Sequence, residues 1–209
     1  MGDLILKWMQ EIEDTTKVEW SRVKYFIIAI LMFFIDLEIL VGMYNRWVFE
    51  TTVLTSTLLI VGYLLMQNPF NKTEKFYKEV FLWACYWIIL GLFFEPYEGG
   101  IKKDKATISY YFITSGMSIL LIIFFSIFID IFNKQKWFKL LIENGQNPMI
   151  AYAGINNLII PIFYLTGMMF LLNKYAITPW LGFVKGLIIT IFLTLAVSLF
   201  TKLKIIWRT

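Results

Sequence analysis

Six long runs of apolar residues, separated by short polar stretches, dominate the pattern along the chain. A helix that crosses the hydrocarbon core of a membrane needs about 20 mostly apolar residues. Runs of this kind predict spans near residues 25–45, 51–69, 76–94, 108–130, 149–172 and 180–200. The runs do not alternate between apolar and polar residues, as the strands of a membrane barrel do. The sequence therefore predicts an all-α fold, a polytopic bundle of about six transmembrane helices.

Composition supports this prediction and excludes several other classes of protein. Of the 209 residues, 59% are hydrophobic and only 16% are charged, whereas a soluble domain has about 25% charged residues. The chain has one cysteine, Cys85, and no histidine, which excludes a disulfide scaffold and zinc sites of the Cys/His type. We expect the lipid bilayer as a partner and no metal. The net charge of +4 lies in short patches between apolar runs, so we expect no nucleic acid.

The distribution of Lys and Arg predicts the orientation in the membrane. With six spans both termini lie on one side, and that side collects thirteen of the basic residues against six on the other. The positive-inside rule then places both termini in the cytoplasm and the loop at 95–105 outside. Because no Pro- or Ser-rich linker divides the chain, we expect a single membrane domain over residues 1–209.

The segment 1–22 opens with a largely apolar stretch, Leu4–Met9, with no helix cap and no positively charged signal region before it. Two interpretations remain open. The segment is the remnant of a helix that begins in a missing N-terminal half, or it is a short cytoplasmic or interfacial helix that Trp8 anchors on the membrane.

The outward loop is the most informative polar segment of the chain. Its charged candidates are Glu95, Glu98, Lys102, Lys103 and Asp104. Carboxylates beside lysines at the mouth of a membrane protein can position a polar substrate or act as acid and base. Gly99–Gly100 permits a sharp turn that brings the backbone close to another group. The alternative is a solvated turn in which Thr107 caps the next helix.

A second polar turn lies on the predicted cytoplasmic side. It contains Asn144, Gln146 and Asn147 and leads into Pro148, which suits the first turn of a helix. These amides could face the side where coenzyme A is available, and Asn147 could instead cap the fifth span. The nearby lysines that could attract the phosphates of coenzyme A are Lys134, Lys136 and Lys139.

Four polar side chains fall inside predicted spans. Asp36 and Glu38 are two residues apart, so they lie about 200° apart around a helix and cannot share one face. Acids inside a membrane are costly and often functional. Asn156 and Asn157 need partners, either another helix or a polar cavity. Pro161 should kink the fifth span close to them.

Three segments together, Gly99–Tyr111, Asn144–Tyr152 and the ending from Lys204, resemble one family. They are similar to the C-terminal half of bacterial membrane acyltransferase-like proteins related to heparan-α-glucosaminide N-acetyltransferase, a group often described only as a domain of unknown function. The resemblance covers nearly the whole chain, with the three segments in the same order.

The resemblance implies an acyl transfer linked to a membrane. The animal enzyme moves an acetyl group from cytoplasmic acetyl-CoA to a glucosamine on the other side, and its catalytic histidine lies in the N-terminal half. This chain has no histidine, so no catalytic residue carries over. We therefore expect a fragment that lacks the N-terminal half and is inactive alone, located in a bacterial inner membrane. Its expected partners are that half or a second subunit, or a further copy of itself.

Acetyl-CoA would be the acyl donor of the full-length family, although no motif in this chain binds a cofactor recognisably. An alternative from a different class also stays open. The chain could be a non-enzymatic multi-pass module, such as a transporter-like or scaffold subunit. The acids at 36 and 38, the asparagine pair and the kink at Pro161 would then line a pathway.

Overall fold

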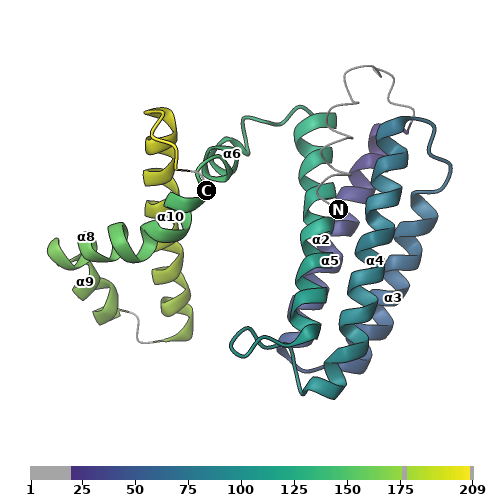
Figure 1. The fold of residues 1–209 in the computed structure, drawn as a ribbon, viewed down its shortest axis with the longest axis horizontal. Coiled ribbons are helices and arrows are strands. Elements are labelled where there is room, and N and C mark those ends of the chain that lie inside the picture. The colour runs from purple at the N-terminus through teal and green to yellow at the C-terminus, as the bar shows by residue number, and fades with distance from the viewer. Residues whose placement is uncertain (1–19, 176–177, 208–209) are drawn as a thin grey trace. The chain divides into compact units, whose positions relative to one another are not determined.

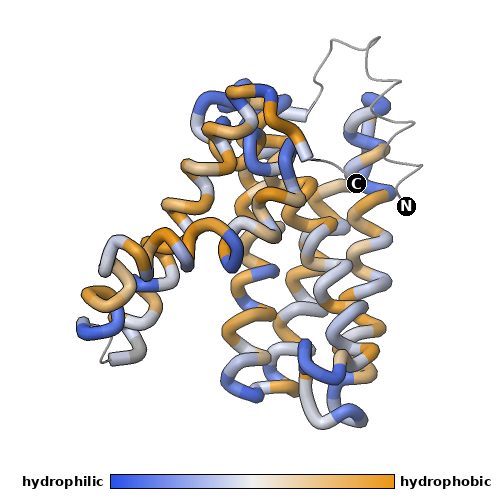
Figure 2. The backbone as a smooth tube through the Cα atoms, turned by 60° about the vertical axis from the view of Figure 1, so that its left-hand side comes forward, coloured by the Kyte–Doolittle hydropathy of each residue, from blue (hydrophilic) through white to orange (hydrophobic). Residues whose placement is uncertain are grey.

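The computed structural model describes residues 20–175 and 178–207, and every regular element within them is a helix (Figure 1). Six helical segments are long and apolar enough to cross a membrane. This confirms the predicted all-α fold with six candidate spans. Of the segment predicted at residues 1–22, residues 1–19 lie outside the described part of the chain. Figure 2 shows hydrophobic residues along the long helices and hydrophilic residues gathered near their ends.

Contacts group the chain into two compact units, residues Met1–Asn133 and Lys134–Thr209. Each unit has its own buried cluster of apolar side chains. We describe the two units separately, and one membrane domain over 1–209 stays a prediction.

From residue 20 on, the first unit is a bundle of four long helices. They are α2 (Arg22–Tyr44), α3 (Val48–Leu65), α4 (Lys72–Glu98) and α5 (Ile108–Ser126), which continues as the π-helix η2 (Ile127–Ile131). The closest packing joins α4 to α5, where Gly116 leaves room for the neighbouring helix. A Cβ at Gly116 would lie 3.1 Å from the carbonyl oxygen of Ala84, so a larger residue there would push the two helices apart.

One buried carboxylate ties the start of α2 to the start of α4. Glu74 is completely buried. Its Oε1 accepts hydrogen bonds from the Trp20 amide at 2.8 Å and the Tyr25 hydroxyl at 3.0 Å. Its Oε2 accepts from the amides of Phe70 at 2.7 Å and Asn71 at 3.3 Å. Glu74 thus satisfies backbone donors that would otherwise be buried without a partner.

Helix α4 runs four residues past the predicted end of the third span at residue 94. Glu95 and Glu98 therefore lie on a helix, and the prediction that they belong to a loop is wrong. Pro96 interrupts the helix little, because in its last turn the ring removes only one hydrogen bond. Gly99 then ends the helix with φ of 65°, the left-handed conformation that glycine adopts without strain.

In its described residues, the second unit contains one broken span, one continuous span and two short helices. Its elements are α6 (Lys139–Gly145), α7 (Pro148–Gly154), the π-helix η3 (Ile155–Ile159), α8 (Ile160–Leu165), α9 (Met168–Tyr175) and α10 (Pro179–Lys202). The fifth span was predicted to reach residue 172, and this is wrong, because the helix stops at Leu165. Gly167, with φ of 72°, turns the chain there.

Pro161 lies in the first turn of α8, two residues after the end of the π-helix η3 and at the place where we predicted a kink. Proline has no amide hydrogen to donate to the carbonyl four residues earlier, and its ring crowds that carbonyl. A π-helical turn is one of the recognised ways in which a helix accommodates such an interruption. The two features together explain why this span is built from three short segments.

Candidate functional site

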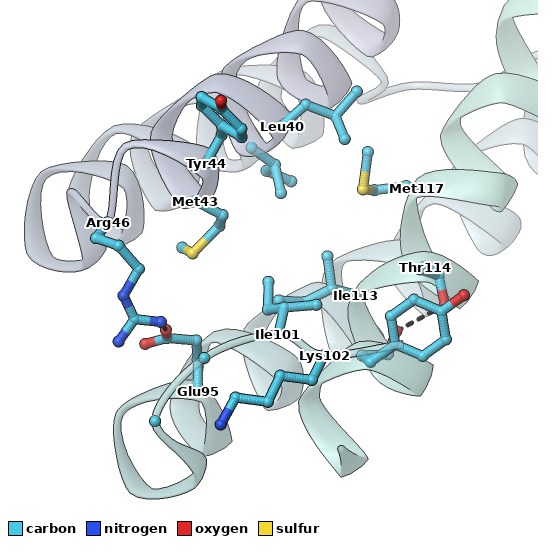
Figure 3. A pocket seen from close by; sticks show the side chains of 14 residues that line it. Leu40, Met43, Tyr44, Arg46, Glu95, Ile101, Lys102, Ile113, Thr114 and Met117 are labelled. Atoms are coloured by element: carbon cyan, nitrogen blue, oxygen red, sulfur yellow. Dashed lines mark hydrogen bonds and ion pairs between the residues drawn. The ribbon is translucent and has the colours of Figure 1, made fainter. Parts of the chain in front are cut away.

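A pocket of about 530 Å³ opens in the first unit, between α2, α5 and the connection that leads into α5. Its volume falls within the range of about 300–1,000 Å³ that is usual for small-molecule sites. Figure 3 shows Arg46 and Glu95 on one side of the pocket and Leu40 and Met117 on the other. The pocket therefore has a charged end and an apolar end.

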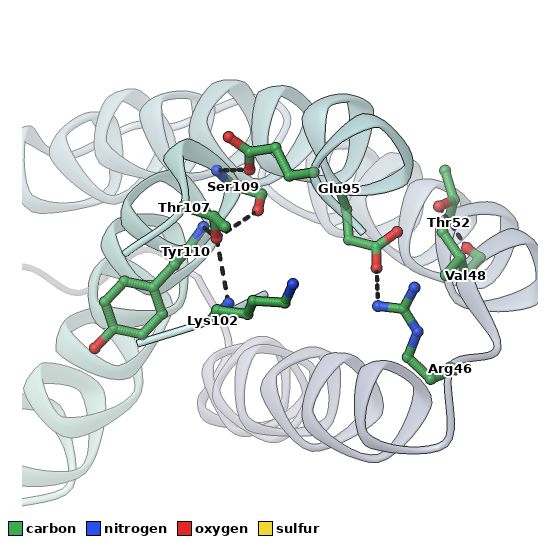
Figure 4. Close-up of polar contacts among 9 residues, drawn as sticks. Arg46, Val48, Thr52, Glu95, Lys102, Thr107, Ser109 and Tyr110 are labelled. Carbon is green, nitrogen blue, oxygen red and sulfur yellow. Dashed lines mark hydrogen bonds and ion pairs between the residues drawn. The ribbon is translucent and has the colours of Figure 1, made fainter. Parts of the chain in front are cut away.

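The charged end is built on an ion pair between the α2–α3 connection and the last turn of α4. Arg46, between α2 and α3, donates from Nη1 to Glu95 Oε1 at 2.6 Å (Figure 4). The Glu95 side chain is 1% exposed, whereas that of Arg46 is 54% exposed. The second carboxylate oxygen, Glu95 Oε2, is buried without a hydrogen-bond partner in the described residues. Because burying an acceptor without a donor is costly, the Glu95 carboxylate keeps an unused capacity to accept a hydrogen bond.

Gly100 explains how the arginine reaches this position. Its φ is 119°, and a Cβ there would clash with the guanidinium of Arg46. The sharp turn predicted at Gly99–Gly100 is therefore confirmed, and the group that approaches the backbone is the side chain of Arg46.

The connection into α5 is ordered around Thr107, which caps this helix, as one of the two interpretations of the loop expected. Its hydroxyl accepts from the amides of Tyr110 at 3.3 Å and Lys102 at 3.2 Å and from the Ser109 hydroxyl at 3.1 Å. These bonds fix the backbone at Lys102, and its side chain extends toward the Arg46–Glu95 pair (Figure 4).

The structure divides the predicted loop residues into two groups. Glu95 and Lys102 line the pocket. Glu98 instead caps α5, since its carboxylate accepts from the amides of Ile108 at 2.9 Å and Ser109 at 2.8 Å. Lys103 and Asp104 are exposed and do not line the pocket.

Arg46 is the pocket residue that the sequence analysis missed. From the sequence, Arg46 was used only as one of the basic residues that predict the orientation of the chain in the membrane. A single arginine between two apolar runs carries no signal of a site by itself. Its partner is 49 residues away, and only the packing of α2 and α4 against their common neighbours α3 and α5 brings the two together.

The two acids in α2 have different surroundings, as their spacing predicted. Glu38 accepts a hydrogen bond from the Thr55 hydroxyl on α3. Asp36 is 3% exposed, and neither of its carboxylate oxygens has a hydrogen-bond partner in the described residues. Asp36 precedes the pocket residues Ile39 and Leu40 by three and four positions, so it lies on the same side of α2, one turn deeper.

The amides of the second polar turn hold the end of the chain. Asn147 is fully buried, donates to the carbonyl of Ile205 at 2.8 Å and accepts from the Trp207 amide at 3.0 Å. Its side chain makes no capping bond, so the interpretation of Asn147 as a helix cap is wrong. Asn144 donates to the carbonyl of Thr194 at 3.1 Å. Gln146 is exposed.

Glu143 is an acidic residue that the sequence analysis did not select. It is nearly buried and accepts a hydrogen bond from the Ser198 hydroxyl. The ammonium groups of Lys202 and Lys139 lie 3.7 Å and 4.0 Å from its carboxylate oxygens. The Ser198 hydrogen bond first, and then these charges, lower the pKa of Glu143 below its usual value, although burial acts in the opposite direction. Lys139, a candidate for coenzyme A phosphates, is thus already paired.

This lowered pKa predicts an acid-sensitive link between α6 and α10. Because the folded form binds the proton less tightly than the unfolded form, Glu143 contributes stability above its ordinary pKa of about 4.3. That contribution is lost as the pH falls through the lower folded-state pKa. We expect Glu143→Gln to lower the melting temperature at pH 7 and to make little difference at pH 3. Thermal unfolding in detergent at both pH values measures this, and an equal difference at both would contradict it.

The asparagine pair in the fifth span is exposed on the second unit. Asn157 donates to the Ala153 carbonyl of its own helix at 2.9 Å and borders a hollow of about 330 Å³ that Ile150 and Trp207 also line. Within the described residues neither side chain bonds to another helix.

In the part of the chain that the structure describes, no three acidic or cysteine side chains gather closely enough to hold a metal ion. Comparisons with family models, with curated proteins and with solved structures find no match to this chain. The site must therefore be interpreted from its own geometry.

Proposed function

We propose that this chain is the acceptor-binding membrane part of an acyltransferase-like protein. Acetyl-CoA is the acyl donor, and a sugar or a similar molecule with a hydroxyl or amine is the acceptor. The observation that supports this is the carboxylate of Glu95, a residue that lines the pocket and whose buried Oε2 has no donor in the described residues. An acceptor hydroxyl or amine would supply that missing hydrogen bond.

The same contact suits the chemistry of acyl transfer. The acceptor oxygen or nitrogen forms a bond to the acyl carbon, and the bond from that carbon to its carrier breaks. The proton that the acceptor loses passes through the Glu95 carboxylate to the departing carrier, so atoms and charge balance. Arg46 holds the carboxylate in place through the 2.6 Å ion pair.

The rest of the proposal follows the resemblance. The histidine of that family is not in this chain, so we propose that an N-terminal half or a second subunit supplies it and that the chain is inactive alone. The chain lies in a bacterial inner membrane with both termini on the cytoplasmic side, and the pocket faces outward. Lys134 and Lys136, on the cytoplasmic side, attract the phosphates of coenzyme A.

The test replaces Glu95 by glutamine in the native gene. Membranes of the source cells receive acetyl-CoA with a labelled acetyl group, and transfer to lipid and to added glucosamine is measured. We expect transfer to fall by about 100-fold, the lower end of the usual contribution of a positioned acid–base group. Arg46 is half-exposed, so its loss of a partner should not unfold the chain.

Asp104→Asn is the matched control, since it changes an acid to an amide in an exposed residue of the connection that follows α4. It should leave transfer unchanged. Equal transfer in the Glu95 variant and the wild type, or no difference between membranes with and without the chain, would refute the proposal.

The second candidate function is the non-enzymatic multi-pass module, and Asp36 favours it. A buried carboxyl group with no hydrogen-bond partner in a membrane helix is a common mark of a pathway for protons or ions. In this case the source membranes would show no acetyl transfer that depends on the chain, and replacement of Asp36 would change transport.

A further inference from the structure

The polarity of the pocket changes along its length in a way that suits one shape of ligand. Arg46, Glu95 and Lys102 form one end. The opposite wall is formed by Leu40 of α2 and by Met117 of α5 (Figure 3). A small polar molecule would satisfy the first end and leave the second unfilled. A molecule with a polar head and an apolar tail matches both.

The charged end favours an anion. Arg46 uses Nη1 for Glu95, but a guanidinium has five N–H donors, so several remain for a ligand. The Lys102 ammonium has no ion pair in the described residues. Glu98, the other nearby acid, is occupied by the amides at the start of α5. One carboxylate therefore faces two cations, and the balance is positive.

Glu95 Oε2 adds a second requirement for the head of the ligand. Glu95 lines the pocket, and this oxygen of its carboxylate is buried without a donor among the described residues. An anionic group alone would be repelled by it. A head that carries a hydroxyl beside its anionic group would place the hydroxyl on Glu95 and the anion on Arg46 and Lys102.

The apolar wall continues onto lipid-facing surface. Leu40 is 57% exposed on α2, which is one of the candidate spans. Met117 is half-buried on α5, another candidate span. A hydrocarbon chain that leaves the pocket between these two residues would enter the bilayer directly.

We infer that the pocket binds an anionic amphiphile with a hydroxyl-bearing head, such as a phosphoglycerol lipid. Its phosphate lies between Arg46 and Lys102, its hydroxyl on Glu95 Oε2, and its tail between α2 and α5. This inference rests on the proposed function, because it names the chemical class of the acceptor that would occupy the same pocket.

The experiment is native mass spectrometry of the full chain purified in detergent. Phosphatidylglycerol and phosphatidylcholine with the same acyl chains are added in equal amounts. We expect phosphatidylglycerol to be retained about fivefold more often, the effect of one charge pair near a surface. Lys102→Gln should remove most of this preference. The neighbouring Lys103→Gln, which does not line the pocket, should preserve it.

Two further comparisons test whether the lipid tail is needed for binding and whether lipid binding and acetyl transfer stand or fall separately. Excess glycerol 3-phosphate, which has the head but no tail, should not displace the lipid. Equal retention of the two lipids, equal effects of the two lysine variants, or displacement by glycerol 3-phosphate would each overturn the inference. Chain-dependent acetyl transfer without any lipid preference would refute this inference alone. A lipid preference without acetyl transfer would refute only the proposed function.

Discussion

Replacing Glu74 by alanine is expected to lower the free energy of unfolding by about 3–5 kcal/mol, the usual cost of breaking a buried network of this kind. Glu74 accepts four hydrogen bonds at the junction of α2 and α4. Alanine leaves three amides and the Tyr25 hydroxyl without their acceptor, and water does not reach this fully buried position readily. Equilibrium unfolding in mixed micelles with increasing denaturing detergent measures the change.

An isosteric variant makes the test sharper. In Glu74→Gln one oxygen remains, so one pair of donors keeps its acceptor while the other pair meets an amide donor. We expect an intermediate loss of about 2 kcal/mol. Glu79→Ala, at an exposed residue of the same helix, should change stability by less than about 0.5 kcal/mol. Equal stability of the Glu74→Ala variant and the wild type would show that the carboxylate does not join the two helices.

Replacing Asp36 by leucine is expected to have the opposite sign and to stabilise the chain by about 1–3 kcal/mol. Both carboxylate oxygens are buried without a donor in the described residues. Leucine branches at the same carbon as aspartate, so it fills a similar volume and removes the cost of burying a polar group. The same unfolding measurement applies.

Glu38→Leu is the control for Asp36, because Glu38 has the Thr55 hydroxyl as a donor. Removing that acceptor leaves Thr55 unsatisfied, so this variant should not be stabilised. If Asp36→Leu destabilises the chain instead, Asp36 has a partner beyond the described residues, and the non-enzymatic module gains support. Loss of function together with higher stability would mark Asp36 as a residue retained for its chemistry.

The amino-acid pattern predicted most of the fold correctly and misplaced several helix ends, among them that of α3, which stops at Leu65 and not at residue 69. Hydropathy located all six candidate spans. It placed the end of α4 too early, because charged residues resemble a loop when their partners are unknown. Glu98 is part of α4, and its charged side chain is satisfied there because it accepts hydrogen bonds from the first amides of α5. Hydropathy also predicted that the fifth span continues past Gly167, because an uncharged turn is as apolar as the helix before it.

For the candidate site, the sequence located two of its three charged residues. Glu95 and Lys102 belong to the polar segment at 95–105, from which candidate site residues were predicted. Arg46 did not, although Gly100 was a usable signal. A glycine at a predicted sharp turn indicates that another group approaches the backbone, and the cations on the same side of the membrane were the candidates for that group.

What the sequence by itself determined is the all-α architecture with six candidate spans. Long uncharged runs must satisfy their backbone hydrogen bonds within the segment, and this requirement is local. What only the tertiary structure decided is which polar groups meet. Arg46 reaches Glu95 across 49 residues, Glu38 finds Thr55, and Asp36 finds no partner among the described residues. Those outcomes depend on how helices distant in sequence pack, because an ion pair or hydrogen bond acts only over a few ångströms.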